Sequence, residues 1–174
     1  MLKLILFACG TVVIITYSRK SLANPHSHGF FRFFAFEAIL GLLLLNLDDW
    51  FTNPFSILHI LSWLLLLASL ILVTHGILLL HHIGRPNGNF ENTTQLVKVG
   101  AFRYIRHPLY GSLLFLGWGA ALKEPTLFTG FLVLFTTGAL LATARVEEAE
   151  NLSKFGVEYA DYQKETKMFI PFLF

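Results

Sequence analysis

Long apolar blocks separated by short polar segments constrain this chain more than any other feature of its sequence. The longest block, Phe55–Leu80, contains no Asp, Glu, Lys or Arg. A bilayer core is crossed by a run of about 20 mainly apolar residues in a helix. Hydrophobic residues make up 55% of the chain and charged residues 14%, whereas charged residues make up about 25% of an average soluble domain. The chain is therefore predicted to be an all-α integral membrane protein.

Five apolar blocks predict about five transmembrane helices within a single membrane domain, residues 1–174. The predicted spans are Leu2–Tyr17, Phe30–Leu47, Phe55–Leu80, Leu109–Leu122 and Pro125–Ala144. Residues 1–80 hold the first three spans, and residues 81–174 hold a polar loop, a helical hairpin and an amphipathic tail. The hairpin turns at Lys123-Glu124, and Pro125 suits the first turn of the returning helix.

The loops differ in their basic residues, and this difference predicts the orientation in the membrane. Basic residues lie in the first loop (Arg19, Lys20) and in the third loop (Arg85, Lys98, Arg103, Arg106). The second loop carries only Asp48 and Asp49. We therefore expect the first loop, the third loop and the C-terminal tail to face the cytoplasm. The net charge of +2 is small and dispersed, and it predicts no nucleic-acid partner.

Polar and ionisable residues concentrate in two segments, one on each side of the hairpin: Gln95–Gly111 and Arg145–Tyr162. At about 1.5 Å per residue, the outgoing arm is roughly 20 Å long and the return arm to Glu147 roughly 33 Å. Arg106 and His107 should therefore meet Glu147 and Glu148 near the membrane surface. Ionisable groups in such a place are costly unless paired or used, which makes them candidates for function.

The two segments carry ordered motifs that resemble one enzyme family. The motifs are Leu96-Val97-x-x-Gly100-x-x-Arg103, then Arg106-His107-Pro108-x-Tyr110, Glu147-Glu148-x-x-x-Leu152 and Phe155-Gly156-x-x-Tyr159-x-x-Tyr162. In this order they resemble the isoprenylcysteine carboxyl methyltransferase family, which is related to the membrane phospholipid methyltransferases. The resemblance covers roughly residues 80–170. Gln95 departs from the pattern, because the family often has histidine there.

The resemblance implies an enzyme that transfers a methyl group from S-adenosylmethionine to a lipophilic acceptor, such as an isoprenylcysteine carboxylate or another lipid. Arg106 and His107 would bind the cofactor carboxylate through charge-assisted hydrogen bonds. Glu147 and Glu148 would accept from its ammonium and ribose. The implied cofactor-binding residues are Gln95, Leu96, Val97, Gly100, Tyr104, Arg106, His107, Tyr110, Glu147 and Glu148. The implied catalytic residues are Arg106, His107 and Glu148.

Several other functions stay open at the level of sequence. One alternative with the same chemistry is N-methylation of a phospholipid or other lipid amine, in which His107 or a glutamate would take the proton. Another is an NADPH-dependent membrane reductase of the sterol type. Those reductases share an Arg-His-Pro-like stretch but typically carry Arg-Asp-Glu where this chain has Val146-Glu147-Glu148. A non-enzymatic membrane protein is a third, with Arg106 and His107 serving only as interface anchors.

Histidines and phenylalanines form two further groups. His75, His81 and His82 end the third span, but they lack the His-x-x-His-His or His-x-x-x-His spacing of membrane metal oxygenases. We therefore predict no metal site, and the sequence does not assign these histidines a role. Aromatic residues cluster at the start of the second span: Phe30, Phe31, Phe33, Phe34 and Phe36. We interpret them as an aromatic belt at the membrane interface or, alternatively, as the lining of a tunnel for a hydrophobic substrate.

Overall fold

The computed structural model describes residues 1–88 and 92–171. It is 74% helical, and no strand is formed in the part of the chain that it describes. The all-α prediction is therefore confirmed. The helices are α1 (Leu2–Leu22), α2 (His28–Leu45), α3 (Ile57–His82), α4 (Pro108–Ala121), α5 (Leu127–Phe155) and α6 (Val157–Glu165), with short 3₁₀ turns at Leu47–Asp49 and Gly100–Arg103.

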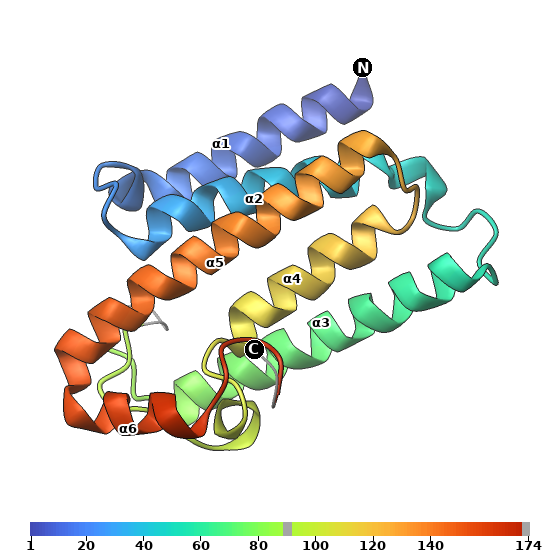
Figure 1. Ribbon diagram of the computed structural model, residues 1–174. Coiled ribbons are helices and arrows are strands. Elements are labelled where there is room, and N and C mark those ends of the chain that lie inside the picture. The colour runs from blue at the N-terminus through green and yellow to red at the C-terminus, as the bar shows by residue number, and fades with distance from the viewer. Residues whose placement is uncertain (89–91, 172–174) are drawn as a thin grey trace.

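Five of the helices lie side by side in the order α1, α2, α5, α4, α3, and α6 lies across one end of the bundle (Figure 1). The order in space differs from the order in sequence because α5 packs against both α2 and α4. The hairpin of α4 and α5 is thereby placed between the N-terminal helices and α3. This arrangement brings the end of α5 close to the polar connection between α3 and α4.

Four helices are long and apolar enough to cross a membrane: α1, α2, α3 and α5. The fifth, α4, has only 14 residues, which is about 21 Å at 1.5 Å per residue. That length falls short of the roughly 30 Å hydrocarbon core of a bilayer. The prediction of an integral membrane protein with about five embedded helices therefore holds, although α4 is too short to span the membrane unaided.

Small and hydroxylated residues hold α4 tightly against α3. The Ser62 hydroxyl donates to the Gly119 carbonyl at 2.6 Å, and the Ser69 hydroxyl donates to the Ser112 carbonyl at 2.7 Å. A Cβ on Gly119 would lie 3.2 Å from the Ser62 carbonyl oxygen. Small residues and hydroxyl bonds of this kind are typical of helix contacts within membranes. They fix α4, and with it the residues that precede its first turn.

The helix ends differ from the predicted spans where polar residues begin. α1 continues to Leu22, beyond the predicted Tyr17, and α5 continues to Phe155 rather than ending at Ala144. The prediction was wrong about these ends because apolar content reports where the lipid ends, while helical hydrogen bonding continues into the polar region. The extended α5 carries three glutamates, Glu147, Glu148 and Glu150, past the apolar part of the bundle.

Different connecting segments lie at the two ends of the bundle. The loop after α1, the connection after α3 and α6 lie at the same end (Figure 1), as the basic loops predict. At this end His28 Nδ1 lies 2.6 Å from Glu150 Oε2, which ties α2 to α5. At the other end Lys3 pairs with Asp48 at 2.8 Å.

Candidate functional site

The site is built where the connection before α4 meets the C-terminal segment after α6. The Arg106 amide donates to the Lys167 carbonyl at 2.8 Å, and the His107 amide donates to the Met168 carbonyl at 3.1 Å. The Lys167 amide donates in turn to the Tyr104 carbonyl at 3.2 Å. The two segments therefore run in parallel, about sixty residues apart in sequence, and hold each other in place.

Arg106 joins three parts of the chain through one guanidinium group. Its Nε donates to Glu148 Oε1 at 2.6 Å, and its Nη1 donates to the carbonyls of Thr166 at 2.5 Å and Gln163 at 3.3 Å. The side chains of Arg106 and Glu148 are only 11% and 14% exposed. A charge-assisted bond at such a sheltered place is among the stronger hydrogen bonds in proteins. Arg106 thus ties α5 to the end of α6.

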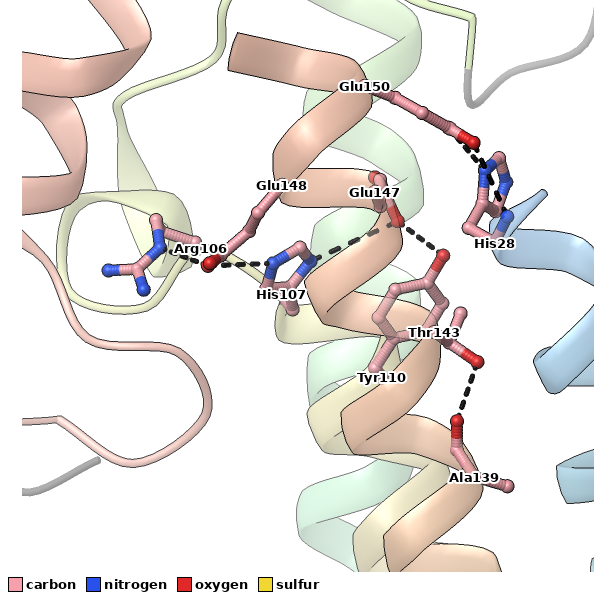
Figure 2. Close-up of polar contacts among 9 residues, drawn as sticks. All are labelled: His28, Arg106, His107, Tyr110, Ala139, Thr143, Glu147, Glu148 and Glu150. Carbon is pink, nitrogen blue, oxygen red and sulfur yellow. Dashed lines mark hydrogen bonds and ion pairs between the residues drawn. The ribbon is translucent and has the colours of Figure 1, made fainter. Parts of the chain in front are cut away.

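His107 lies between two glutamates of α5 (Figure 2). Its Nε2 lies 3.3 Å from Glu148 Oε1, and its Nδ1 lies 4.0 Å from Glu147 Oε2. Its ring stacks on that of Tyr110 at a centroid distance of 5.5 Å. The Tyr110 hydroxyl donates to Glu147. The imidazole, which is nearly fully buried, therefore has a carboxylate within reach of each ring nitrogen.

Two tyrosines of α6 complete the polar part of the site. The Tyr162 hydroxyl donates to the Phe102 carbonyl at 2.5 Å, and the side chain of Tyr159 lies near that of Asn151. Burial raises the pKa of Tyr159, and the negative charge of Glu148 raises it further. Burial likewise raises the pKa of Tyr162. Both phenols therefore stay protonated and act as hydrogen-bond donors at every physiological pH.

These groups enclose a cleft, here called the polar cleft, between the α3–α4 connection, α5 and α6. Its lining combines ionisable and amide groups with aromatic rings. The lining residues are Leu80, Thr93, Leu96, Val97, Phe102, Arg106, His107, Pro108, Leu109, Tyr110, Glu147, Asn151, Phe155, Tyr159 and Tyr162. A concave site with a few convergent polar groups among apolar ones is typical of small-molecule binding.

Six of the ten predicted cofactor residues line the polar cleft: Leu96, Val97, Arg106, His107, Tyr110 and Glu147. The other four lie outside its lining. Gln95 is exposed, and Tyr104 is 49% exposed. Gly100 has φ +59° and packs so closely on α3 that a Cβ would lie 2.4 Å from His75 Nε2. Glu148 lies behind the cleft, bound to Arg106 and His107.

The structure adds residues that were not predicted to bind the cofactor. Asn151 and Phe155 line the polar cleft together with Glu147, and the three are spaced four residues apart on α5. That spacing places side chains on one face of a helix, so it is a signal that the sequence contained. The predicted span ended at Ala144, so the continuation of this helical face to Asn151 and Phe155 was missed.

A second cavity, here called the apolar groove, lies between α3, α4 and α5 and reaches the C-terminal segment. Its lining is Leu61, Leu65, Gly111, Leu114, Phe115, Trp118, Leu122, Thr137, Leu141, Phe169 and Ile170. Trp118 Nε1 donates to the Thr137 hydroxyl at 3.3 Å, and that hydroxyl donates to the Val133 carbonyl at 2.8 Å. The two polar side chains of the groove therefore satisfy each other, and the remaining surface is hydrocarbon.

The aromatic cluster at the start of α2 gathers beside a third hollow. Phe30, Phe31 and Phe34 line it together with residues of α5. It is separate from the polar cleft and the apolar groove, since it shares no lining residue with either. These phenylalanines therefore do not line the cavity nearest to His107.

Comparison with known proteins agrees with this geometry. The chain is 29% identical to the methanethiol S-methyltransferase of Crocosphaera subtropica (strain ATCC 51142 / BH68) over 139 residues, which are 77% of this chain and 53% of that protein. The chain thus spans about half the length of this curated relative. The sequence model of the phospholipid methyltransferase family matches residues 57–158, a range that holds α3, α4 and nearly all of the polar cleft. The chain belongs to the phospholipid methyltransferase family.

Proposed function

We propose that this protein transfers a methyl group from S-adenosylmethionine to a lipophilic acceptor at the cytoplasmic face of the membrane. The observation that carries the proposal is that two unlike cavities lie close together, with Phe169 of one packed 6.0 Å from His107 of the other. The polar cleft, with its ionisable cluster around His107, lies next to the hydrocarbon-lined apolar groove. A charged cofactor needs a polar surface and a hydrophobic acceptor needs an apolar one, and the two surfaces must adjoin for the reactants to meet.

The residues of the polar cleft fit the chemistry of S-adenosylmethionine. Glu147 offers a carboxylate to the cofactor ammonium, and its side chain is 27% exposed. Arg106 uses Nε and Nη1 for its bonds, while Nη2 has no hydrogen-bond partner among the described residues. That nitrogen can donate to the cofactor carboxylate. Phe102 and Phe155 offer flat apolar surfaces for the adenine ring.

The cofactor, when bound, supplies an electrophilic methyl on sulfur, which the lone pair of the acceptor takes as the carbon–sulfur bond breaks and the electron pair stays on the sulfur. The protein's part is to hold the two reactants in line, which alone supplies much of the catalysis in such a displacement. A carboxylate acceptor needs no base. A thiol or amine acceptor must lose a proton, and Glu147 is the cleft carboxylate available to accept it.

The apolar groove supports a lipophilic acceptor. It is partly open on one side, where Leu61 and Trp118 are 45% and 39% exposed. An acceptor chain dissolved in the bilayer would enter here without crossing water. The described part of the chain offers the groove no charged side chain, so the reactive head of the acceptor would be held from the polar cleft.

Methylation of a small thiol is the second candidate. The observation in its favour is the name of the relative, methanethiol S-methyltransferase. A small thiol would need the polar cleft and only the nearest part of the apolar groove. Comparing the rates for a short-chain and a long-chain thiol would separate the two candidates.

Binding of the cofactor is the first test. Isothermal titration calorimetry of the detergent-purified protein should detect S-adenosylmethionine and its demethylated product, and it should detect no NADPH. A Glu147→Gln variant should bind the cofactor about ten- to a hundredfold more weakly, since a hydrogen bond to a charged group is worth about 1.5–3 kcal/mol. Binding of NADPH together with no binding of S-adenosylmethionine would contradict the proposal.

A further inference from the structure

We infer that Phe169 determines which acceptors this methyltransferase accepts, because its ring divides the apolar groove from the polar cleft. The inference rests on the proposed function and names the part of the chain that sets its specificity. Phe169 lies in the C-terminal segment after α6, far in sequence from the hairpin motifs. Its side chain is 4% exposed.

Phe169 lines one cavity and packs against residues that line the other. It lines the apolar groove next to Gly111. Its centroid lies 6.0 Å from that of His107, and the ring packs in one cluster with Tyr110. His107 and Tyr110 both line the polar cleft. An acceptor chain in the groove therefore meets Phe169 before its reactive atom can reach the cofactor.

The backbone holds this ring in place. The amide of His107 donates to the Met168 carbonyl, and the amide of Arg106 donates to the Lys167 carbonyl. Since the guanidinium of Arg106 also binds the Thr166 carbonyl, every residue from 166 to 168 is tied to the α3–α4 connection. The backbone that leads into Phe169 is thus held in a fixed position beside the α3–α4 connection.

A ring held between the apolar groove and His107 would select by the bulk of the acceptor near its reactive atom. A straight alkyl chain that ends in the reactive atom is slim enough to pass the ring. An acceptor that carries a wide group beside that atom is not. Shortening Phe169 should therefore favour wide acceptors, while narrowing the groove at Gly111 should disfavour long chains. A Cβ at Gly111 would meet its neighbours at 3.8–4.0 Å, so Gly111→Ala fits without displacing them.

The experiment compares methyl transfer to three thiols: 1-butanethiol, 1-dodecanethiol and 2-naphthalenethiol. It uses the full chain in detergent and measures kcat/KM for each thiol and the Kd for S-adenosylmethionine. Phe169→Leu and Phe169→Ala should each raise the ratio of 2-naphthalenethiol to 1-butanethiol at least fivefold. Their Kd for the cofactor should stay within about twofold of the parent. Phe169→Leu keeps most of the buried volume of the side chain, so it still tests the ratio if Phe169→Ala does not fold.

Two further variants serve as comparisons. Gly111→Ala should lower the ratio of 1-dodecanethiol transfer to 1-butanethiol transfer at least fivefold. Phe131→Ala removes a ring that is 63% exposed on α5 and lines neither cavity, so its thiol profile should match the parent. Unchanged ratios in both Phe169 variants, with the parent active, would overturn the role of Phe169 alone.

The remaining outcomes separate the inference from the proposed function. If Gly111→Ala leaves the ratio of 1-dodecanethiol transfer to 1-butanethiol transfer unchanged, the apolar groove holds ordinary membrane lipid and the inference is wrong about its occupant. If the parent binds no S-adenosylmethionine and methylates none of the three thiols, the proposed function fails and the inference fails with it. If the parent binds the cofactor but methylates none of them, the assigned acceptor passage is wrong.

Discussion

At the scale of single residues, Glu147 and Glu148 are neighbours in sequence with different surroundings. Glu148 accepts from Arg106 and lies beside His107, away from the lining of the polar cleft. Glu147 accepts from Tyr110 and lines the cleft. The two carboxylates diverge from α5, with His107 between them (Figure 2). Glu148 is therefore placed to orient the cluster, whereas Glu147 faces the polar cleft.

Replacing each glutamate by glutamine should separate these roles. Glu148→Gln removes the carboxylate that Arg106 and His107 share, so we expect the free energy of unfolding to fall by about 1.5–3 kcal/mol. Glu147→Gln should leave unfolding nearly unchanged and weaken cofactor binding. Thermal unfolding in detergent and calorimetry measure the two effects. Equal losses of stability in both variants would contradict the assignment.

The pair Arg106 and Glu148 should also behave as one unit. Arg106→Ala and Glu148→Ala should each weaken cofactor binding, and the double variant should lose less than the sum, because the first change already breaks their shared bond. A double-variant cycle of Kd values measures the coupling. Strict additivity would mean that the two residues act on the cofactor independently.

The sequence places Lys123 in the hairpin turn, but it does not reveal that the side chain is buried. Its side chain is 1% exposed, its Nζ lies 3.6 Å from the centroid of the Trp63 ring and 5.6 Å from that of Trp50, and no hydrogen-bond acceptor reaches it in the described structure. Burial lowers the pKa of Lys123 below its usual 10.5. The aromatic rings stabilise the ammonium only in part.

This lowered pKa predicts how stability changes with pH. Between the lowered pKa of the folded protein and the higher pKa of the unfolded chain, the unfolded chain binds more protons, so stability rises as the pH rises through that window. Lys123→Met removes the titrating group and should flatten this part of the curve. Thermal unfolding from pH 7 to pH 10 measures the difference. Curves of the parent and the variant that run parallel would contradict the expectation.

At the scale of elements, the extension of α5 beyond the membrane matters most. The helix carries Glu147, Asn151 and Phe155 on one face along the wall of the polar cleft. Asn151 lies near Tyr159 of α6, and both residues line the polar cleft. If α5 ended at Ala144, the helix would not present these three side chains to the polar cleft.

Asn151→Ala should therefore weaken binding of S-adenosylmethionine. The loss of a neutral hydrogen bond is worth about 1 kcal/mol, roughly a fivefold change in Kd. Ser153→Ala, an exposed position on the same turn of α5, is the matched control and should bind as the parent does. Calorimetry at constant detergent concentration measures both. Equal Kd values for the two variants would remove Asn151 from the site.

At the scale of the whole molecule, the loop after α1, the α3–α4 connection and α6 share one end of the bundle (Figure 1), and the polar cleft is lined by residues of that connection and of α6. We expect this end to face the cytoplasm, since basic loops are retained there. In a Cys9→Ser background, Glu158→Cys should react with an impermeant maleimide only after the membrane is opened. Asn53→Cys should react in intact cells. The reverse pattern would place the site on the other side of the membrane.

The sequence alone determined the class of the fold and the chemistry of its two clusters. Runs of apolar residues set helix length, because a bilayer tolerates only backbone that bonds to itself. The order of the motifs around the hairpin brought Arg106, His107, Tyr110 and Glu147 to one place, as the structure has them. Local pattern suffices for these features, since each depends on residues close together in the chain or on the two arms of one hairpin.

Only the tertiary structure decided which partner each group takes. The bonds of Arg106 to Thr166 and Gln163, the burial of Lys123 between tryptophans and the position of Phe169 beside His107 all join distant segments. Helical periodicity places a side chain on a face but does not say which loop covers that face. The covering depends on how α5 packs between α2 and α4 and on where the chain after α6 returns to the site.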